Sequence, residues 1–383
     1  MSGGAGVHAG IYAALPFCPS RCHYCSNPAT TYTPERGAAY LTRLLAELDA
    51  EAAGWRDRVI DSVYIGGGTP TLFPPEAVAR LLEKITRRYR LDPAAEISIE
   101  ANPETVTYKK AAALRHSGIN RVSIGAQSFD PGQLVRLGRI HTTEAVDRAV
   151  DAVRSAGFDN VSLDLIFAQP GQTPASWEDS LKHAISLSPD HISVYGLTVE
   201  DGTMLAKNIA TGDTRLPDPD IYAAHYGAAV DLLEAAGYAR YEVSNFALPG
   251  FACRHNLRYW QGGDWLGVGA GAASHMGGHR FDRPADVDSY LAAPPQSREA
   301  TSEERLNPTE RAHEMAVFGL RTKGGIDLTA IHDTAGAALP DTALASLDTL
   351  REQGLVSGDN GHFRPTSLGF LHHDTIGAEL ASS

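Results

Sequence analysis

Short apolar runs alternate with amphipathic segments along the first half of the chain. Ile11 to Leu15 is one such run, and an apolar run of this length is typical of a strand buried within a sheet. The next segment shows the other pattern, because Tyr40, Leu44 and Leu48 recur at the spacing of a helix that buries one face. The whole pattern predicts strands at 11–15, 62–65, 96–100, 121–124, 160–166 and 191–195, with helices beginning at Pro34 and Pro75, near Tyr108, and at Thr143 and Ala175.

This alternation predicts the fold class. Strands and helices that follow one another in turn indicate an α/β fold with a parallel sheet and crossover helices. Barrels built in this way carry their chemistry at the carboxyl ends of the strands. Polar residues at those ends are therefore the first candidates for a functional site.

The C-terminal part of the chain has a different pattern. Residues 292–297, Ala-Ala-Pro-Pro-Gln-Ser, have the composition of a linker. Beyond them the sequence predicts a small helical domain that includes a two-stranded hairpin within 355–365. We therefore expect three parts: a core of residues 1–200, an extension of residues 201–295 and a C-terminal domain of residues 296–383.

Composition and charge argue against several classes of protein. With 383 residues, of which 43% are hydrophobic, the chain is long enough for one large domain and a smaller one. Its formal net charge of −13 argues against non-specific nucleic-acid binding. No apolar run approaches the length that spans a bilayer, and residues 1–7 lack the features of an export signal. We expect a cytoplasmic protein with reduced thiols and at most peripheral membrane association.

A loop directly after the first predicted strand holds three of the four cysteines, Cys18, Cys22 and Cys25. Thiolates grouped in one loop can converge on one metal centre, and soft sulfur ligands select iron–sulfur clusters or zinc. A structural zinc site needs four ligands, and this loop offers only His23 as a fourth. A [4Fe–4S] cluster held by three cysteines leaves one iron open to a substrate. The spacing alone leaves zinc and a metal-free loop as alternatives.

The C-x3-C-x2-C spacing of this loop resembles that of the radical S-adenosylmethionine (SAM) superfamily. The resemblance implies a partial (β/α)6 TIM-like barrel whose three cysteines hold a [4Fe–4S] cluster. In that superfamily the open iron binds SAM and cleaves it reductively to a 5′-deoxyadenosyl radical. The resemblance also implies an electron donor of the flavodoxin or ferredoxin type.

Motifs at successive strand ends strengthen this resemblance. Within it, Glu100 and Arg139 flank the methionyl end of SAM and Asp164 takes the ribose hydroxyls, roles that suit carboxylates and a guanidinium. From the residues alone, Gly66–Gly68 also fits a tight turn, and Asp164 in an apolar strand also fits a structural network. The SAM contacts that the resemblance implies are Tyr12, Gly67, Thr69, Glu100, Gln127, Arg139 and Asp164.

A second landmark is the segment 253–260, Cys-Arg-His-Asn-Leu-Arg-Tyr-Trp. From about Ile11 to Leu291 the chain resembles the coproporphyrinogen dehydrogenase-like, HemN-related branch of the superfamily. Within that branch it is most similar to the haem chaperones of the HemW family, whose HNxxYW motif this segment matches. The resemblance implies haem as bound cargo and haem-acceptor proteins as partners.

The same segment supplies candidate haem contacts. The imidazole of His255 can ligate haem iron, and the thiolate of Cys253 is a second conceivable ligand. Tyr259 and Trp260 can form aromatic walls for the macrocycle. The alternative is an ordinary turn with a hydrogen-bonded histidine and packed aromatic rings.

Two other functions stay open within the branch. One is a radical methyltransferase or cyclopropanase that uses a second SAM. The other, oxygen-independent coproporphyrinogen III dehydrogenase, fits less well, because its motif has a further cysteine where this chain has Asn27. The chain also departs from the haem-chaperone pattern at Ala14, Ser26, Asn27 and Ala273, and we expect these departures around the cofactor mouth.

The C-terminal part resembles the winged-helix-like domain of the same branch. A winged helix invites a DNA-binding interpretation. The acidic local composition and the resemblance both favour a lid or an interaction domain.

Overall fold

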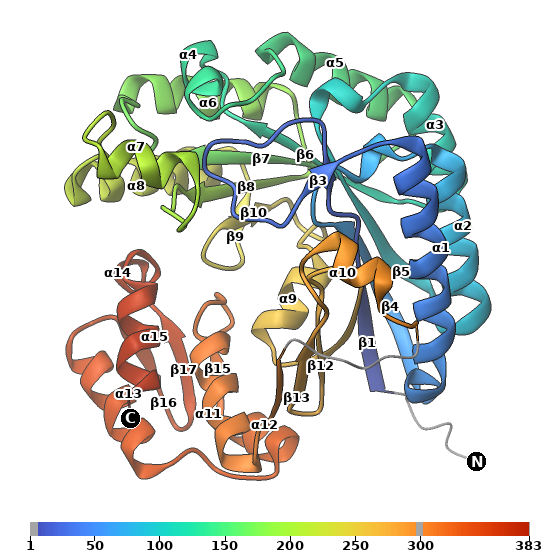
Figure 1. Cartoon of the computed structure of the whole chain (residues 1–383). Helices are drawn as coiled ribbons and strands as arrows, with labels where there is room; N and C mark the ends of the chain where they lie inside the picture. The colour runs from blue at the N-terminus through green and yellow to red at the C-terminus, as the bar shows by residue number, and fades with distance from the viewer. Residues whose placement is uncertain (1–6, 296–301, 383) are drawn as a thin grey trace.

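A twelve-stranded sheet forms the centre of the molecule, and helices cover its outer side (Figure 1). The computed structural model describes residues 7–295 and 302–382, so the end of the predicted linker lies outside the described residues. The strand order is β14-β13-β12-β11-β1-β4-β5-β6-β7-β8-β10-β9. The six predicted strands are confirmed as the parallel β1 (Val7–Ala14), β4 (Arg58–Gly66), β5 (Arg90–Ala101), β6 (Arg121–Gln127), β7 (Val161–Phe167) and β8 (His191–Gly196).

The helices between these strands begin where the sequence signals them. Thr33 caps the first helix, because its hydroxyl accepts a bond from the backbone N–H of Arg36 at 3.2 Å. Thr173 caps a later one through a reciprocal capping box with Ser176. These helices are α1 (Pro34–Glu51), α2 (Pro75–Arg88), α3 (Tyr108–His116), α5 (Thr143–Ser155) and α6 (Pro174–Ser186).

The sheet is wider than the pattern predicted. β11 (Asp264–Val268) pairs in parallel with β1, and the antiparallel strands β12 (Ala273–Met276), β13 (His279–Asp282) and β14 (Glu303–Arg305) continue from it. On the other side β10 (Asn245–Ala247) and β9 (Ala239–Arg240) extend β8 antiparallel. The large sheet thus reaches Arg305, beyond the boundary expected at residue 296.

A buried ion cluster ties the extension to α1. Arg283 Nε lies 2.7 Å from a carboxylate oxygen of Glu47, and its Nη2 lies 2.6 Å from Glu51. Tyr290, on α10 (Val287–Ala292), donates its hydroxyl to the same Glu47 carboxylate at 2.5 Å. All four side chains are almost fully buried. Because buried carboxylates are costly without partners, Arg283 stabilises this packing, together with Arg43, whose Nη1 lies 3.6 Å from Glu47.

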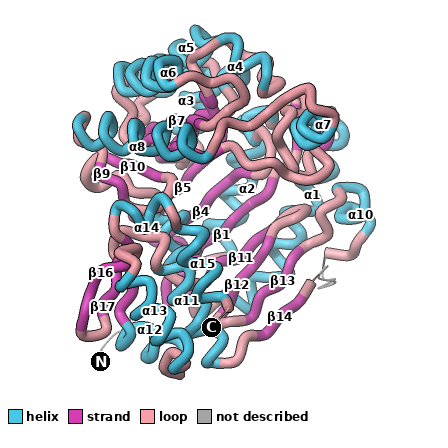
Figure 2. Tube along the Cα trace, turned by 90° about the vertical axis from the view of Figure 1, so that its left-hand side faces the viewer, coloured by secondary structure: helices cyan, strands magenta, loops and turns pink. Residues whose placement is uncertain are grey.

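The C-terminal domain has a hydrophobic core of its own and lies below β8, β9 and β10 (Figures 1 and 2). The predicted hairpin is present, with one short strand added to it, and two helices separated at His372 follow it. No helix among the described residues combines the length and the apolarity needed to cross a membrane. The elements of this domain are α11 (Pro308–Gly319), β15 (Ile326–Asp327), α12 (Leu328–Ala335), α13 (Asp341–Glu352), β16 (Val356–Asp359), β17 (His362–Pro365), α14 (Ser367–Leu371) and α15 (His373–Ala381).

Candidate cofactor site

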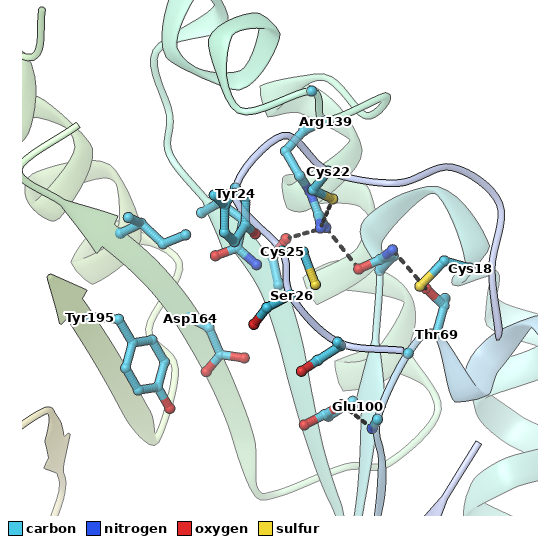
Figure 3. A pocket seen from close by; sticks show the side chains of 18 of the residues that line it. Cys18, Cys22, Tyr24, Cys25, Ser26, Thr69, Glu100, Arg139, Asp164 and Tyr195 are labelled. Carbon is cyan, nitrogen blue, oxygen red and sulfur yellow. Dashed lines mark hydrogen bonds between the residues drawn. The ribbon is translucent and has the colours of Figure 1, made fainter. Parts of the chain in front are cut away.

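A cavity of about 500 Å³ lies at the carboxyl ends of the parallel strands, under the cysteine loop (Figure 3). Its volume is within the range of small-molecule sites, roughly 300–1,000 Å³. Figure 3 shows the Cys25 thiol and the carboxylates of Glu100 and Asp164 directed into the same space. Of the residues predicted from the sequence, the lining includes Cys18, Cys22, Cys25, Gly67, Thr69, Glu100, Gln127, Arg139 and Asp164.

The cysteine loop is held in place by its backbone. It leaves the short strand β2 (Phe17–Cys18), which pairs with β3 (Thr30–Thr31). The backbone N–H of His23 donates to Leu137 at 2.9 Å, and the carbonyl of His23 accepts from Leu205 at 2.8 Å. These bonds fix the loop against the helices on either side of the cavity.

The three thiols of this loop are free, and each is partly exposed. Burial raises the pKa of Cys18 and of Cys25. Within residues 7–295 and 302–382 no three His, Cys, Asp or Glu side chains converge tightly enough for a single metal ion. Thiols that border a shared cavity fit a larger group, such as a four-iron cluster, better than one ion.

Arg139 connects the cysteine loop to the strand ends. Its guanidinium donates to the sulfur of Cys22 at 3.4 Å, to the side-chain oxygen of Asn102 at 2.7 Å and to the Gly125 carbonyl at 3.2 Å. Asn102, just after β5, in turn donates to Thr69 at 3.0 Å. The sequence analysis did not select Asn102, although its position at a strand end was a usable signal.

The approach of Arg139 depends on the glycine before it. Gly138 has a φ of +70°, and a Cβ there would lie 2.7 Å from the ring of His23. A side chain at this position would be strained and would push the cysteine loop outward. Gly138 therefore helps to set where Arg139 meets Cys22.

Glu100 lies half-buried at the end of β5. Burial, together with the nearby Asp164, raises the pKa of Glu100 to about 7. One carboxylate oxygen accepts the backbone N–H of Gly67 at 3.1 Å. A Cβ on Gly66 would lie 2.9 Å from this carboxylate, so the glycine turn makes room for Glu100 as well as for a ligand.

Asp164 lies at the centre of a serine network. Ser193 donates to it at 2.7 Å, Ser123 at 3.1 Å and Ser162 at 3.5 Å. Burial raises the pKa of Asp164. The two interpretations of Asp164 are thus compatible, because the carboxylate is both a network residue and part of the cavity wall.

Of the two remaining candidate SAM contacts, Gln127 belongs to the cavity lining and Tyr12 does not. Gln127 lines the cavity at the end of β6, with a φ of +63°. Tyr12 lies on β1 beneath the glycine turn, its hydroxyl 3.3 Å from where a Cβ on Gly67 would be. Its ring stacks on Tyr64, with centroids 6.2 Å apart. Tyr12 therefore supports the turn from below.

The candidate haem ligands are buried in the structure. His255 lies in the first turn of α9 (Arg254–Trp260), and its two ring nitrogens lie 3.0 Å from the hydroxyl of Ser62 and 2.9 Å from that of Tyr259. Burial lowers the pKa of His255 to about 3. The thiol of Cys253 donates to buried Glu96 at 3.4 Å, and burial raises the pKa of Cys253 to about 12.

In the structure the 253–260 segment has a hydrogen-bonded histidine and packed aromatic rings, as the alternative to a haem site predicted. Neither Cys253 nor His255 presents a free donor to a macrocycle, because both are engaged inside the protein. Trp260, at the other end of α9, points toward the C-terminal domain, where its ring stacks under the guanidinium of Arg321 at 4.7 Å. Its ring also contacts that of Phe318, with centroids 6.1 Å apart. The motif thus joins the barrel to the C-terminal domain.

Of the positions at which the sequence differs from the haem-chaperone pattern, only some line the cofactor cavity. Ser26 and Asn27 line the cavity. Ala14 is buried at the end of β1, where its carbonyl accepts the hydroxyl of Tyr40 at 2.9 Å. Ala273 lies on β12 instead, and its carbonyl accepts the indole N–H of Trp265 at 2.8 Å.

Comparison with known proteins agrees with the fold and the cysteine loop. The family model for the radical SAM superfamily matches residues 12–184, and that for the HemN C-terminal domain matches residues 306–372. The solved structure of coproporphyrinogen III oxidase (HemN) from Escherichia coli has the same fold, with a TM-score of 0.84 at 24% identity over 98% of this chain and 90% of that one. The molecule is thus a radical SAM protein with a HemN-type C-terminal domain.

Its curated relatives define the family further. The haem chaperone HemW of Lactococcus lactis is 32% identical over 359 residues, which cover 94% of this chain and 93% of the relative. HemW of Mycobacterium tuberculosis H37Rv is 41% identical over 286 residues, which cover 73% of each chain. The chain belongs to the HemW family.

Proposed function

We propose that this chain is a haem chaperone that holds a [4Fe–4S] cluster and SAM at the strand ends and carries haem to acceptor proteins. The observation that carries the proposal is the shared cavity, in which Cys18, Cys22 and Cys25 face Glu100 and Asp164. The relatives that match nearly the whole chain are named as haem chaperones, which supplies the cargo.

The residues present suit both groups. A cluster held by Cys18, Cys22 and Cys25 would supply an electron for SAM chemistry, taken from a flavodoxin- or ferredoxin-type donor. Glu100 accepts from the ammonium of SAM, and Asp164 accepts from the ribose hydroxyls. Arg139, which already contacts Cys22, attracts the carboxylate of SAM. Gly67, Thr69 and Gln127 shape the cavity around the ligand, and Tyr12 supports the glycine turn.

Replacing Asp164 by asparagine is expected to weaken SAM binding without loss of iron. The amide keeps one acceptor oxygen and adds an N–H₂ group that faces serine hydroxyls, so the bonds to ribose are lost. Hydrogen bonds to a charged group are worth about 1.5–3 kcal/mol, which corresponds to roughly a 10- to 100-fold rise in the Kd for SAM. Equilibrium binding of SAM to the anaerobically reconstituted protein measures this, with the exposed Asp201→Asn as the control. Equal SAM affinity in Asp164→Asn and the wild type would reject the ribose role.

The affinity for SAM is expected to rise with pH through neutrality. Glu100, whose pKa is raised to about 7, is mostly protonated below that pH and mostly carboxylate above it. Only the carboxylate attracts the SAM ammonium, so the Kd should fall several-fold, up to about tenfold, between about pH 6 and pH 8. Glu100→Gln should bind SAM weakly at every pH in this window. A wild-type profile as flat as that of Glu100→Gln would contradict the assignment.

Haem binding itself is tested by an anaerobic haem titration of the reconstituted protein, followed by absorbance. We expect saturable binding with a defined stoichiometry. A protein that binds no haem, yet forms 5′-deoxyadenosine and S-adenosylhomocysteine with a small-molecule substrate, would instead be a radical methyltransferase.

A further inference from the structure

Arg121, the first residue of β6, is a buried arginine whose charge has no direct hydrogen-bonded partner on two of its nitrogens. Only 1% of its surface is exposed. Among the described residues, none accepts a hydrogen bond from its Nε or its Nη1. A guanidinium stays protonated in proteins, and a buried charge is costly unless opposite charges compensate it. Arg121 therefore depends on the carboxylates around it.

The sheet register places Arg121 one layer below the cofactor cavity. Arg121 pairs with Ser98 of β5, and Ser123, two residues further along β6, pairs with Glu100. Side chains two positions apart on a strand share a face, so Arg121 points to the same side as Ser123, which lines the cavity. Two strand residues span about 6–7 Å. Arg121 thus lies below Glu100, and also below Asp164, which accepts a hydrogen bond from Ser123 at 3.1 Å.

A third acidic residue, Glu96, lies on the other side of Arg121. It precedes Ser98 by two residues on β5, and its side chain is buried. Its carboxylate accepts the backbone N–H of Arg254 at 3.1 Å and that of His255 at 3.4 Å, so it is bound to the start of α9. Arg121 is thus one positive charge between a carboxylate that holds α9 and two carboxylates of the cofactor cavity.

The charge of Arg121 favours the ionised form of both cavity carboxyls. Burial and the nearby Asp164 raise the pKa of Glu100 to about 7, and Arg121 opposes this rise. Burial also raises the pKa of Asp164, and the hydrogen bond from Ser193 and the charge of Arg121 oppose it. Without Arg121 both pKa values would be higher, and less of each carboxyl would be ionised at neutral pH.

The other titratable groups that face this part of the barrel stay uncharged between about pH 6 and pH 9. Tyrosines are neutral in this range even at their usual pKa of about 10. Burial raises the pKa of Cys253 to about 12 and lowers that of His255 to about 3. It also lowers the pKa of His191. The tyrosines are Tyr12 on β1, Tyr64 on β4, Tyr195 on β8, Tyr241, and Tyr259 on α9.

The charged groups nearby have partners of their own. Arg139 is bonded to Cys22 at the cavity rim, and Arg258 pairs with Asp61. Glu242, whose pKa burial also raises to about 7, accepts a backbone N–H of the loop that follows it. Because Glu242 and Glu100 titrate in the same range, an experiment has to separate the two.

We propose that Arg121 is a positioning residue of the cofactor site, whose buried guanidinium holds Glu100 and Asp164 as carboxylates, the form that binds SAM. The placement of an arginine with unpartnered N–H groups one layer below two cavity carboxylates supports this role. It rests on the SAM site of the proposed function. Arg121 itself does not line the cavity, so it acts through the two acidic residues.

The test compares the Kd for SAM of the anaerobically reconstituted wild type and of Arg121→Gln across this pH range. The ratio of the two Kd values removes the titration of the SAM amino group, which affects both proteins equally. If loss of the cation raises the pKa of Glu100 by about one unit, the ratio should be about 10 at pH 6, about 5 at pH 7 and about 1 at pH 9. The loss disappears at high pH because Glu100 is then a carboxylate in both proteins. An arginine that only fills space would give the same ratio at every pH.

Three comparisons accompany this measurement. Arg121→Lys keeps the cation, so its ratio to the wild type should not change with pH. Arg87→Gln removes an arginine whose side chain is 75% exposed and should bind SAM as the wild type does. On the Glu100→Gln background, Arg121→Gln should give a ratio without pH dependence, which separates Glu100 from Glu242.

The titration of Glu100 can also be followed without SAM. In cofactor-free protein with ¹³C-labelled glutamate carboxyls, its NMR signal is the one that Glu100→Gln lacks. We expect its midpoint near pH 7 in the wild type, and about one unit higher in Arg121→Gln. If Arg121→Gln does not fold, Glu96→Gln takes its place. That change removes a carboxylate that competes for Arg121, so it should lower the midpoint of Glu100.

Two failures can be told apart. A Kd ratio that stays constant with pH, with the Glu100 midpoint unmoved in Arg121→Gln or, failing that, in Glu96→Gln, would overturn the role of Arg121 and leave the haem-chaperone proposal standing. A wild type that binds no SAM would refute the proposed cofactor site. The carboxyl titration of the cofactor-free protein would still decide whether Arg121 holds Glu100 ionised.

Discussion

Replacing Cys22 by alanine is expected to remove the iron–sulfur cluster altogether. The loop has three thiols, and two of them hold a four-iron cluster too weakly for it to survive reconstitution and desalting. The fourth cysteine, Cys253, cannot take over, because it is fully buried and bonded to Glu96. Iron, acid-labile sulfide and the brown charge-transfer absorbance after anaerobic reconstitution should all fall to background.

Cys253→Ser is the matched control for this change. A serine hydroxyl can still donate to Glu96, so the buried contact is kept and cluster iron should stay at the wild-type level. Metal analysis of the wild type also separates a cluster from the zinc alternative, since zinc in place of iron and sulfide would indicate a structural site. Wild-type iron and sulfide in Cys22→Ala would show that the cluster is held elsewhere.

The central barrel could be predicted because its signals are local. Each strand is an apolar run such as Ile11 to Leu15, and each helix has its own cap and apolar face. β11 could not be predicted in this way, since its pairing with β1 joins segments from opposite ends of the barrel and Gly267 weakens its strand signal. The same holds for β14, three charged residues whose strand conformation comes from pairing with β13.

Much of the lining of the candidate cofactor cavity could also be predicted from the sequence. Parallel strands end at one edge of a sheet, so Glu100 and Asp164 had to lie near the cysteine loop once the strands were assigned. The serines around Asp164 gave no such signal, because only the sheet register brings Ser123 and Ser193 beside it. The direction in which His255 points was also not available from the sequence, since a helix can turn such a residue inward or outward.

Replacing Arg283 by alanine is expected to destabilise the barrel more than any other single change considered. The substitution removes from the buried Glu47 and Glu51 the arginine that pairs with both, and leaves Arg43 at 3.6 Å from Glu47. Removing one partner from a buried ion pair typically costs about 3–5 kcal/mol, and for a domain of this size that corresponds to a fall in melting temperature on the order of 5–10 °C. Thermal unfolding followed by circular dichroism measures this change.

Arg305→Ala is the control for that experiment. Arg305 also pairs with a carboxylate, that of Glu303, but 70% of its side chain is exposed. An exposed pair contributes at most about 1 kcal/mol, so this variant should melt close to the wild type. The comparison separates burial from charge, because both variants remove one arginine from an ion pair. Equal melting temperatures for Arg283→Ala and Arg305→Ala would mean that Glu47 and Glu51 find other compensation, by protonation or by solvent entry, and that the ion cluster does not hold the extension to α1.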